Sequence, residues 1–464
     1  MSKSRFALFF GNRGFFPERL VESARQELKT TLEALGHETL LLDPDATRYG
    51  AVETPAEGKI YADFLKKNEG KFDGVVLCLP NFGDETGAVS ALRDAGVPIL
   101  IQAYPDRLDE MDFQSRRDAF CGKFSVMDVF CQYGVPFTIF PPHVVHPESA
   151  EFARQIDCFD RTCRVVNGMR RFNVGAIGAR TTAFKTVRFD ELALQKYDIT
   201  VEALDLSEVF MRVRDVKEKS DVFDAKLRTL RAYTGWDAVP DEAVRMHARV
   251  SCVIDDLIAE YELDALGFRC WIEIEKELGI APCVLLGELN DRGMPAACEL
   301  DVCNAVAMRA LHLASGAAPT CLDWNNNYGD DPDKCILFHC GPVPQSLMTG
   351  QGQVIDHPMF AKALGPGCGY GPCVGRIAPT PFTYSSCKTD AGELVFYLGE
   401  GTFTEDPIPE EYFGCAGVAE IAGLQDVLAM VGRKGYRHHV SVTPGSLATG
   451  MREAFTSYLG YTVE

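Results

Sequence analysis

Short apolar segments alternate with helical ones over roughly the first 105 residues, and this alternation limits the possible folds more than any other feature. The apolar runs RFALFF (5–10) and DGVVLCLP (73–80) have the length of buried strands. Between them, residues 17–36 show a helical period that stops at Gly36. Strands that alternate with helices form parallel sheets covered on both faces. The sequence therefore predicts a doubly wound α/β domain at the start of the chain.

The rest of the chain divides into further parts. Residues 111–170 are mostly helical and extend the first domain, which we predict to span 1–170. The alternation resumes at FNVGAIGAR, so 171–285 is predicted as a second doubly wound α/β domain. After residue 285, short strands with frequent Gly and Pro predict a β-rich α+β C-terminal domain, 286–464, that carries the site. The helices predicted in this last domain are 301–314, 419–431 and 446–458.

Charge, hydropathy and cysteine content limit the partners and the cellular compartments that are compatible with the sequence. A net charge of −20 at pH 7 argues against nucleic acid, because a polyanion would be repelled. No run of 18 or more apolar residues is present, so no membrane span is predicted, and the first residues lack signal-peptide features. The 17 cysteines are scattered without a C-x-x-C framework, which favours buried thiols over disulfides or structural zinc. These features predict a cytoplasmic protein.

Carboxylates and imidazoles recur beside apolar segments in the predicted C-terminal domain. Glu299 ends PAACE, and Asp323 ends PTCLD. His339 lies in ILFHCG, and His438 and His439 lie in YRHHVSV. Oxygen and imidazole ligands without thiolate favour Mn²⁺, Mg²⁺ or Co²⁺. A lone histidine is more often structural than a ligand, so residue types alone leave a metal site and a set of structural residues evenly balanced.

The alternation of side chains along a strand separates the two adjacent histidines. His438 shares a face with Val440, which predicts a packed residue or one that supports the site from behind, whereas His439 shares a face with Arg437 and Ser441 and is predicted to face a polar site. Asp301, two residues after Glu299, has the position of a helix N-cap.

A pair of carboxylates on a divalent ion suits proton abstraction next to a carbonyl group. The ion acts as a Lewis acid on the carbonyl oxygen. One of the carboxylates then removes the proton from the neighbouring carbon. A carboxylate pair on a metal ion therefore predicts a reaction class without identifying a substrate.

The segment ACELDVCNAVAM, followed by the Asp of CLDW, resembles the L-fucose isomerase and L-arabinose isomerase superfamily, and the resemblance extends over the whole chain. It implies aldose–ketose isomerisation through a cis-enediol intermediate, with Glu299 and Asp323 carrying the proton. It also implies a Mn²⁺ ion, or Co²⁺ or Mg²⁺ in its place, held by Glu299, Asp323 and His439. The arabinose branch has a further histidine ligand at a spacing similar to that of His339, whereas the fucose branch lacks it.

The resemblance also implies a homo-oligomer, a trimer or hexamer, in which the first domain of a neighbouring subunit closes the site. Arg13 in GNRG matches the arginine of the first βα loop in the family, although a solvated loop residue is the alternative. The remaining residues predicted to contact the substrate are Asn81, Phe82, Gln102, Trp324, Arg437 and His438.

The basic segment GRKGYRHH bears on the choice of sugar. Arg433, Lys434 and Arg437 lie close to His439 in the sequence and can attract an anionic sugar, although a solvated turn explains them equally well. Some short members of the superfamily are thought to act on sulfoquinovose, which suits such a cluster. Two other hypotheses stay open: a non-catalytic sugar-binding sensor, and a different metal-dependent sugar epimerase or lyase.

Overall fold

The structure, a computed structural model, describes residues 3–17 and 19–464 and consists of two compact units. The first unit is Met1–Asn167 with Thr449–Gly460, and the second is Gly168–Ala448 with Tyr461–Glu464. None of the helices within the described residues is long and apolar enough to cross a membrane. The cysteines, all of which are described, form no disulfide bond.

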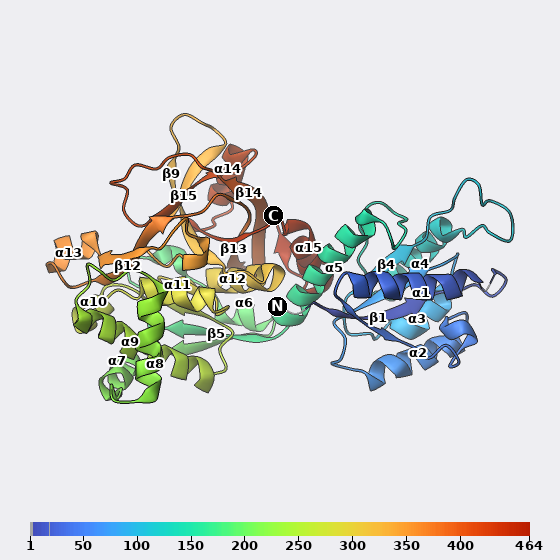
Figure 1. Ribbon diagram of the computed structural model, residues 1–464, viewed down its shortest axis with the longest axis horizontal. Helices are drawn as coiled ribbons and strands as arrows, with labels where there is room; N and C mark the ends of the chain where they lie inside the picture. The colour runs from blue at the N-terminus through green and yellow to red at the C-terminus, as the bar shows by residue number, and fades with distance from the viewer. Residues whose placement is uncertain (1–2, 18) are drawn as a thin grey trace. The chain divides into compact units, whose positions relative to one another are not determined.

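The described part of the first unit contains one four-stranded sheet in the order β2-β1-β3-β4, and every pair of neighbours is parallel. One face of β1 packs against α1 and α5, and the other against α2, α3 and α4 (Figure 1). This confirms the predicted parallel sheet covered on both faces. The elements are β1 (Arg5–Phe10), α1 (Arg19–Ala34), β2 (Glu38–Leu41), α2 (Pro55–Lys67), β3 (Gly74–Leu79), α3 (Glu85–Leu92), β4 (Ile99–Ala103), α4 (Ala119–Tyr133) and α5 (Ala150–Met169).

A second parallel sheet begins the second unit, with its described strands in the order β6-β5-β7-β8. Because the carboxyl ends of parallel strands meet at one edge, the segments that follow β5, β7 and β8 lie together there. The strands are β5 (Phe172–Ile177), β6 (Ile199–Leu204), β7 (Ala265–Phe268) and β8 (Ala296–Cys298). The helices are α6 (Glu191–Gln195), α7 (Leu206–Asp215), α8 (Asp221–Tyr233), α9 (Asp241–Glu260), α10 (Glu273–Leu278), α11 (Cys283–Asp291) and α12 (Val302–Ser315).

The C-terminal half of the second unit is β-rich, as predicted. Its described strands form a mixed nine-stranded sheet in the order β11-β12-β15-β10-β9-β16-β13-β14-β17. Helix α12 contacts β13 and β16 of this sheet and also β7 and β8 of the parallel sheet, so it joins the two layers. The strands are β9 (Thr320–Asn327), β10 (Lys334–His339), β11 (Gln353–Asp356), β12 (Tyr370–Arg376), β13 (Thr380–Asp390), β14 (Glu393–Phe403), β15 (Cys415–Glu420), β16 (His439–Pro444) and β17 (Thr462–Val463).

The helices after residue 300 lie close to the predicted ranges, although residues 449–460 belong to the first unit. Helix α12 (Val302–Ser315) matches 301–314, and α15 (Ala448–Glu453) continues as a π-helical turn that reaches Tyr458. Helix α14 (Leu424–Arg433) begins later than the predicted 419, because residues 415–420 pair as β15 with β10. A short α13 (Pro358–Leu364) was not predicted. The predicted boundaries at 170 and 285 stay predictions.

Candidate active site

Glu299 lies where the chain leaves the parallel sheet and enters helix α12. It follows β8 directly, and Glu299 and Leu300 both have φ values of 61°. Consecutive left-handed residues that are not glycine are costly, and such conformations gather at functional sites. Asp301 then begins α12 as its N-cap, as predicted, and accepts a hydrogen bond from the Asn304 backbone N–H. The tight turn explains how a carboxylate can follow the buried strand β8 directly.

Asp323 and His439 are brought together by strand pairing. They lie directly opposite each other in the antiparallel pair of β9 and β16. His439 Nε2 is 3.0 Å from Glu299 Oε2 and 3.5 Å from Asp323 Oδ1, and the His439 ring is fully buried. Strand β9 continues to Asn327, so Asp323 lies inside the strand, although the apolar segment PTCLD ends at this residue.

The other two histidines border the same point. His339 ends β10, is buried, and its Nε2 has no hydrogen-bond partner among the described residues. His438 Nε2 is 3.7 Å from Asp323 Oδ1, and its side chain is 42% exposed. The prediction of a packed His438 is therefore wrong, because β16 begins only at His439 and strand alternation does not extend to the preceding residue.

Two overlapping sets of side chains have the geometry of a metal site. Glu299, His438 and His439 form one set, and Asp323, His339 and His439 form the other. Within each set the possible ligand atoms lie within 4.8 Å of one another. His439 belongs to both sets, so these five residues form one continuous cluster of oxygen and imidazole donors.

Arg437 was predicted to contact the substrate, but it lies inside the protein. Its side chain is buried and forms an ion pair with Asp301, whose other oxygen accepts a hydrogen bond from His439 Nδ1 at 2.8 Å. Arg437 thus acts on the cluster through Asp301 and is not exposed to a substrate. The predicted basic cluster is not formed either, because Arg437 is enclosed and Lys434 forms an ion pair with Glu464.

The charges of the cluster depend on its buried contacts. Burial raises the pKa of Glu299, but the His439 hydrogen bond and the nearby histidine charges outweigh it and lower that pKa below its usual value. Arg437 and His439 likewise hold the pKa of Asp301 well below its ordinary range, against the effect of burial. Burial disfavours a charged His339, yet Cys340 and Asp323 raise its pKa to about 9. Glu299 and Asp301 are therefore ionised carboxylates at neutral pH.

Two aromatic residues that the sequence interpretation missed border the cluster. Trp271 Nε1 donates a hydrogen bond to Glu299 Oε1 at 3.2 Å. The Phe184 ring lies edge-on to Trp271, with ring centroids 5.9 Å apart, and its centroid is 5.4 Å from that of His438. Both follow strands of the parallel sheet, Trp271 after β7 and Phe184 after β5. Ligand sites form at the carboxyl edge of parallel sheets, and this rule could have identified both aromatic residues from the sequence.

Trp324 points away from the cluster. It is the neighbour of Asp323 on β9, so the two side chains take opposite faces of the strand. Its Nε1 donates to the Tyr397 hydroxyl at 3.2 Å, and its ring lies edge-on to Tyr384. The prediction that Trp324 contacts the substrate is corrected by this packing.

The remaining predicted substrate residues belong to the first unit. Arg13 Nε donates to the Gly83 carbonyl at 2.8 Å, its guanidinium lies over the Phe82 ring, and its backbone N–H donates to Asn81 Oδ1. Arg13 also forms an ion pair with Glu85. These contacts bring Arg13, Asn81 and Phe82 together in the loops after β1 and β3. Gln102 is buried and donates to the Val145 carbonyl.

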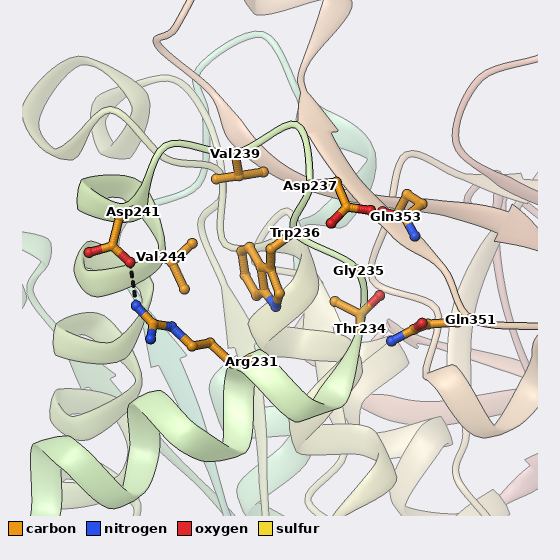
Figure 2. A pocket seen from close by; sticks show the side chains of 10 residues that line it. All are labelled: Arg231, Thr234, Gly235, Trp236, Asp237, Val239, Asp241, Val244, Gln351 and Gln353. Carbon is orange, nitrogen blue, oxygen red and sulfur yellow. Dashed lines mark hydrogen bonds and ion pairs between the residues drawn. The ribbon is translucent and has the colours of Figure 1, made fainter.

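A separate hollow lies elsewhere in the second unit. Its volume is about 410 Å³, and no residue of the histidine–carboxylate cluster lines it. Figure 2 shows Trp236 in the wall and the ion pair of Arg231 with Asp241 beside it. The full lining is Arg231, Thr234, Gly235, Trp236, Asp237, Val239, Asp241, Val244, Gln351 and Gln353.

Family models match both ends of the chain. Residues 7–170 match the N-terminal domain of fucose/sulfoquinovose isomerase, and residues 337–464 match the C-terminal domain of L-fucose isomerase. Among solved structures, a periplasmic solute binding protein of an ABC transporter from Actinobacillus succinogenes 130z with bound D-allose is 15% identical, with coverage of 68% of this chain and 92% of that one. Its TM-score is 0.18, which supports no inference about this chain.

Curated relatives agree with the family models. Sulfoquinovose isomerases of Priestia aryabhattai and Priestia megaterium are each 25% identical over 400 residues, which is 85% of this chain and 85% of each relative. A sulfoquinovose isomerase of Alkalicoccus urumqiensis is 25% identical over 289 residues, 61% of this chain and 63% of the relative. The chain therefore belongs to the fucose-isomerase-like proteins and is an aldose–ketose isomerase.

Proposed function

We propose that the protein is a metal-dependent isomerase that converts a sulfonated aldohexose to its ketose through a cis-enediol intermediate. The observation that carries this proposal is the convergence of Glu299, Asp323 and His439, with 3.0 Å and 3.5 Å separating His439 Nε2 from the two carboxylates. Two acids and an imidazole this close, in a largely buried setting, suit a shared cation.

The donor set fits a divalent ion. Asp323 Oδ1 and His339 Nε2 are buried atoms that lack a hydrogen-bond partner within the described residues, as expected of ligands. Glu299, Asp323 and His439 would hold the ion, with His339 as a further ligand. Carboxylate and imidazole donors suit Mn²⁺, and also Co²⁺ or Mg²⁺. When bound, the ion would polarise the substrate carbonyl as a Lewis acid.

The chain's own groups supply the proton transfer. Isomerisation moves one proton from C2 to C1 and a second from O2 to O1, and an ionised carboxylate beside the carbons can accept the first from C2 and return it to C1. Glu299 is ionised at neutral pH because the histidines lower its pKa. Asp323 is the second carboxylate of the pair, and which of the two is the base stays open. Trp271 holds Glu299 in place through Oε1.

The sulfonated substrate is inferred from the relatives, whose names specify sulfoquinovose. A shared site between subunits is also part of the proposal, with Arg13, Asn81 and Phe82 of a neighbouring copy as its outer wall. Their mutual contacts give that wall a defined shape. The homo-oligomer and the cytoplasmic location stay predictions.

Turnover assays test the proposed function directly. Purified protein, stripped with a chelator and reloaded with Mn²⁺, is given sulfoquinovose, glucose, fucose or arabinose, and the product is identified by NMR. We expect a ketose from sulfoquinovose, with activity lost on chelation and restored by Mn²⁺. Failure to convert any aldose would refute the proposal. An aldose epimer as the product would instead indicate an epimerase.

A further inference from the structure

We propose that the loop between β5 and α6, residues 178–190, binds the anionic group of the substrate through Arg180, Lys185 and Arg188. The ligand class is an aldohexose with a sulfonate or phosphate at C6. This inference rests on the proposed isomerase function and assigns substrate selection to a loop outside the histidine–carboxylate cluster.

The middle of the loop contacts that cluster. The Phe184 ring centroid lies 5.4 Å from that of His438 and 5.9 Å from that of His439. Lys185 is the next residue, and adjacent Cα atoms are about 3.8 Å apart. A cation is therefore placed one residue from a side chain that touches the site.

The beginning of the loop is fixed to the same edge of the sheet. Thr181 Oγ1 donates to the Trp271 carbonyl at 3.0 Å, and Trp271 Nε1 in turn donates to Glu299. An Arg269 guanidinium nitrogen donates to the Ala179 carbonyl at 3.0 Å. Arg180 lies between these two anchored residues, so its backbone is held close to the carboxylate that we assign to proton transfer.

The three cations have no acidic partner in the part of the chain that the structure describes. Arg180 donates to the carbonyls of Thr181 and Thr182, and Arg188 donates to that of Lys185. Lys185 and Arg188 are exposed. The first acid of the loop, Asp190, caps helix α6 by accepting from the Leu192 N–H. The loop thus carries uncompensated positive charge.

The positive loop stands in an acidic chain. The net charge is −20, and two other arginines close to the cluster are paired, Arg437 with Asp301 and Arg269 with Glu273. Arginine and lysine donate strong hydrogen bonds to sulfonate or phosphate oxygens. A cation without an acidic partner can bind such an anion without first breaking an ion pair with a protein carboxylate. The loop therefore offers the anion three cations beside the cluster, whereas Arg437 and Lys434 of the segment 433–437 are already paired.

Substitution to glutamine tests the loop without large changes in volume. Arg180→Gln, Lys185→Gln, Arg188→Gln and the triple variant are compared with Arg433→Gln, an exposed cation of the other basic segment. Substrates are sulfoquinovose, glucose 6-phosphate and neutral glucose, with Mn²⁺ present. Sulfoquinovose binding is also measured by calorimetry. We expect KM for the anionic sugar to rise roughly 10- to 100-fold in the triple variant, the size of one or two lost charged hydrogen bonds. We expect kcat for all sugars, and glucose turnover, to stay near wild type.

Each outcome decides the proposal. An equal loss on glucose and sulfoquinovose, or a loss only in Arg433→Gln, would overturn it. A preference for glucose 6-phosphate that disappears in the triple variant supports the loop and identifies phosphate as the anion. If the wild-type protein converts no aldose, the proposed function is refuted, and calorimetry then tests anion binding by the loop independently. A lower sulfoquinovose affinity in the triple variant than in wild type supports the loop. Unchanged or absent binding overturns the proposal.

Discussion

Asp301 accepts a hydrogen bond from Nδ1 of His439 at 2.8 Å, and both side chains are fully buried. Arg437 keeps Asp301 ionised by lowering its pKa, so the carboxylate acts only as an acceptor and Nδ1 must carry the proton. Burial disfavours a charged His439, yet Cys321, Asp301 and Glu299 raise its pKa well above the usual value in the metal-free protein. Because Nδ1 keeps its proton, a bound ion would take the place of the proton on Nε2, the atom that faces Glu299 and Asp323. Asp301 therefore fixes the tautomer that a metal ligand needs.

Replacing Asp301 by Asn is expected to weaken the metal site and the fold together. Loss of such an outer partner typically lowers metal affinity about 10- to 100-fold. The variant also leaves Arg437 as an uncompensated buried charge, which lowers the free energy of unfolding by about 3–5 kcal/mol. Mn²⁺ titration calorimetry and chemical denaturation measure the two effects.

A double variant separates these two effects. Asp301→Asn with Arg437→Met removes the unpaired charge, so we expect stability to recover while Mn²⁺ affinity stays low. Wild-type affinity in either variant would show that Asp301 does not orient His439.

Glu299→Gln is expected to fold normally and to lose most activity. Glutamine keeps the size of the side chain and can still accept from Trp271 Nε1, but it cannot take up a proton. Removing a general base typically lowers kcat about 10²- to 10⁴-fold. Single-turnover assays with saturating Mn²⁺, together with exchange of the C2 hydrogen with deuterium from solvent, measure the loss. Glu273→Gln, an acid outside the cluster, is the matched control, and full turnover by Glu299→Gln would refute the proton-transfer role.

Trp271→Phe tests whether the indole N–H positions Glu299. Phenylalanine keeps an aromatic ring beside Phe184 but removes the 3.2 Å hydrogen bond to Oε1. One hydrogen bond to a carboxylate is worth about 1.5–3 kcal/mol, so we expect kcat to fall about 10- to 100-fold with KM nearly unchanged. Trp236, which Figure 2 shows in the wall of the separate hollow, is the control. Trp236→Phe removes its indole hydrogen bond to the Leu230 carbonyl and should leave kcat unchanged. A parallel rise in KM would indicate a general packing role for Trp271.

The parts of the molecule that sequence predicts are those set by local pattern. Hydrophobic periodicity gave the parallel sheet of the first unit, and the apolar positions of α1, such as Leu28, are buried as expected. The Asp301 cap also follows from its place before a helix. The contacts of Asp301 with Arg437 and His439 cannot be predicted in this way, because the partners lie 136 and 138 residues further along the chain. The prediction that Trp324 contacts the substrate was wrong because strand β9 continues past Asp323. Side chains alternate along the strand, so the Trp324 side chain points away from the cluster.

A buried acid outside the cluster makes a prediction about pH. Glu275 is 1% exposed, and neither of its carboxyl oxygens has a hydrogen-bond partner among the residues that the structure describes. Burial raises its pKa to about 8, whereas an unfolded glutamate titrates near 4.5. Between these values the folded protein holds a proton that the unfolded chain has lost, so the free energy of unfolding falls as pH rises.

Glu275→Gln should remove this part of the pH dependence, because glutamine does not ionise. At pH 5 the variant and wild type should unfold at similar denaturant concentrations, and by pH 8 the variant should be more stable by on the order of 2–4 kcal/mol. Glu277→Gln, whose side chain is 54% exposed and lies 3.7 Å from Arg214, should follow the wild-type profile. Denaturation midpoints at several pH values measure the difference. A gap between Glu275→Gln and wild type that is constant with pH would show that Glu275 is already ionised in the folded protein at pH 5.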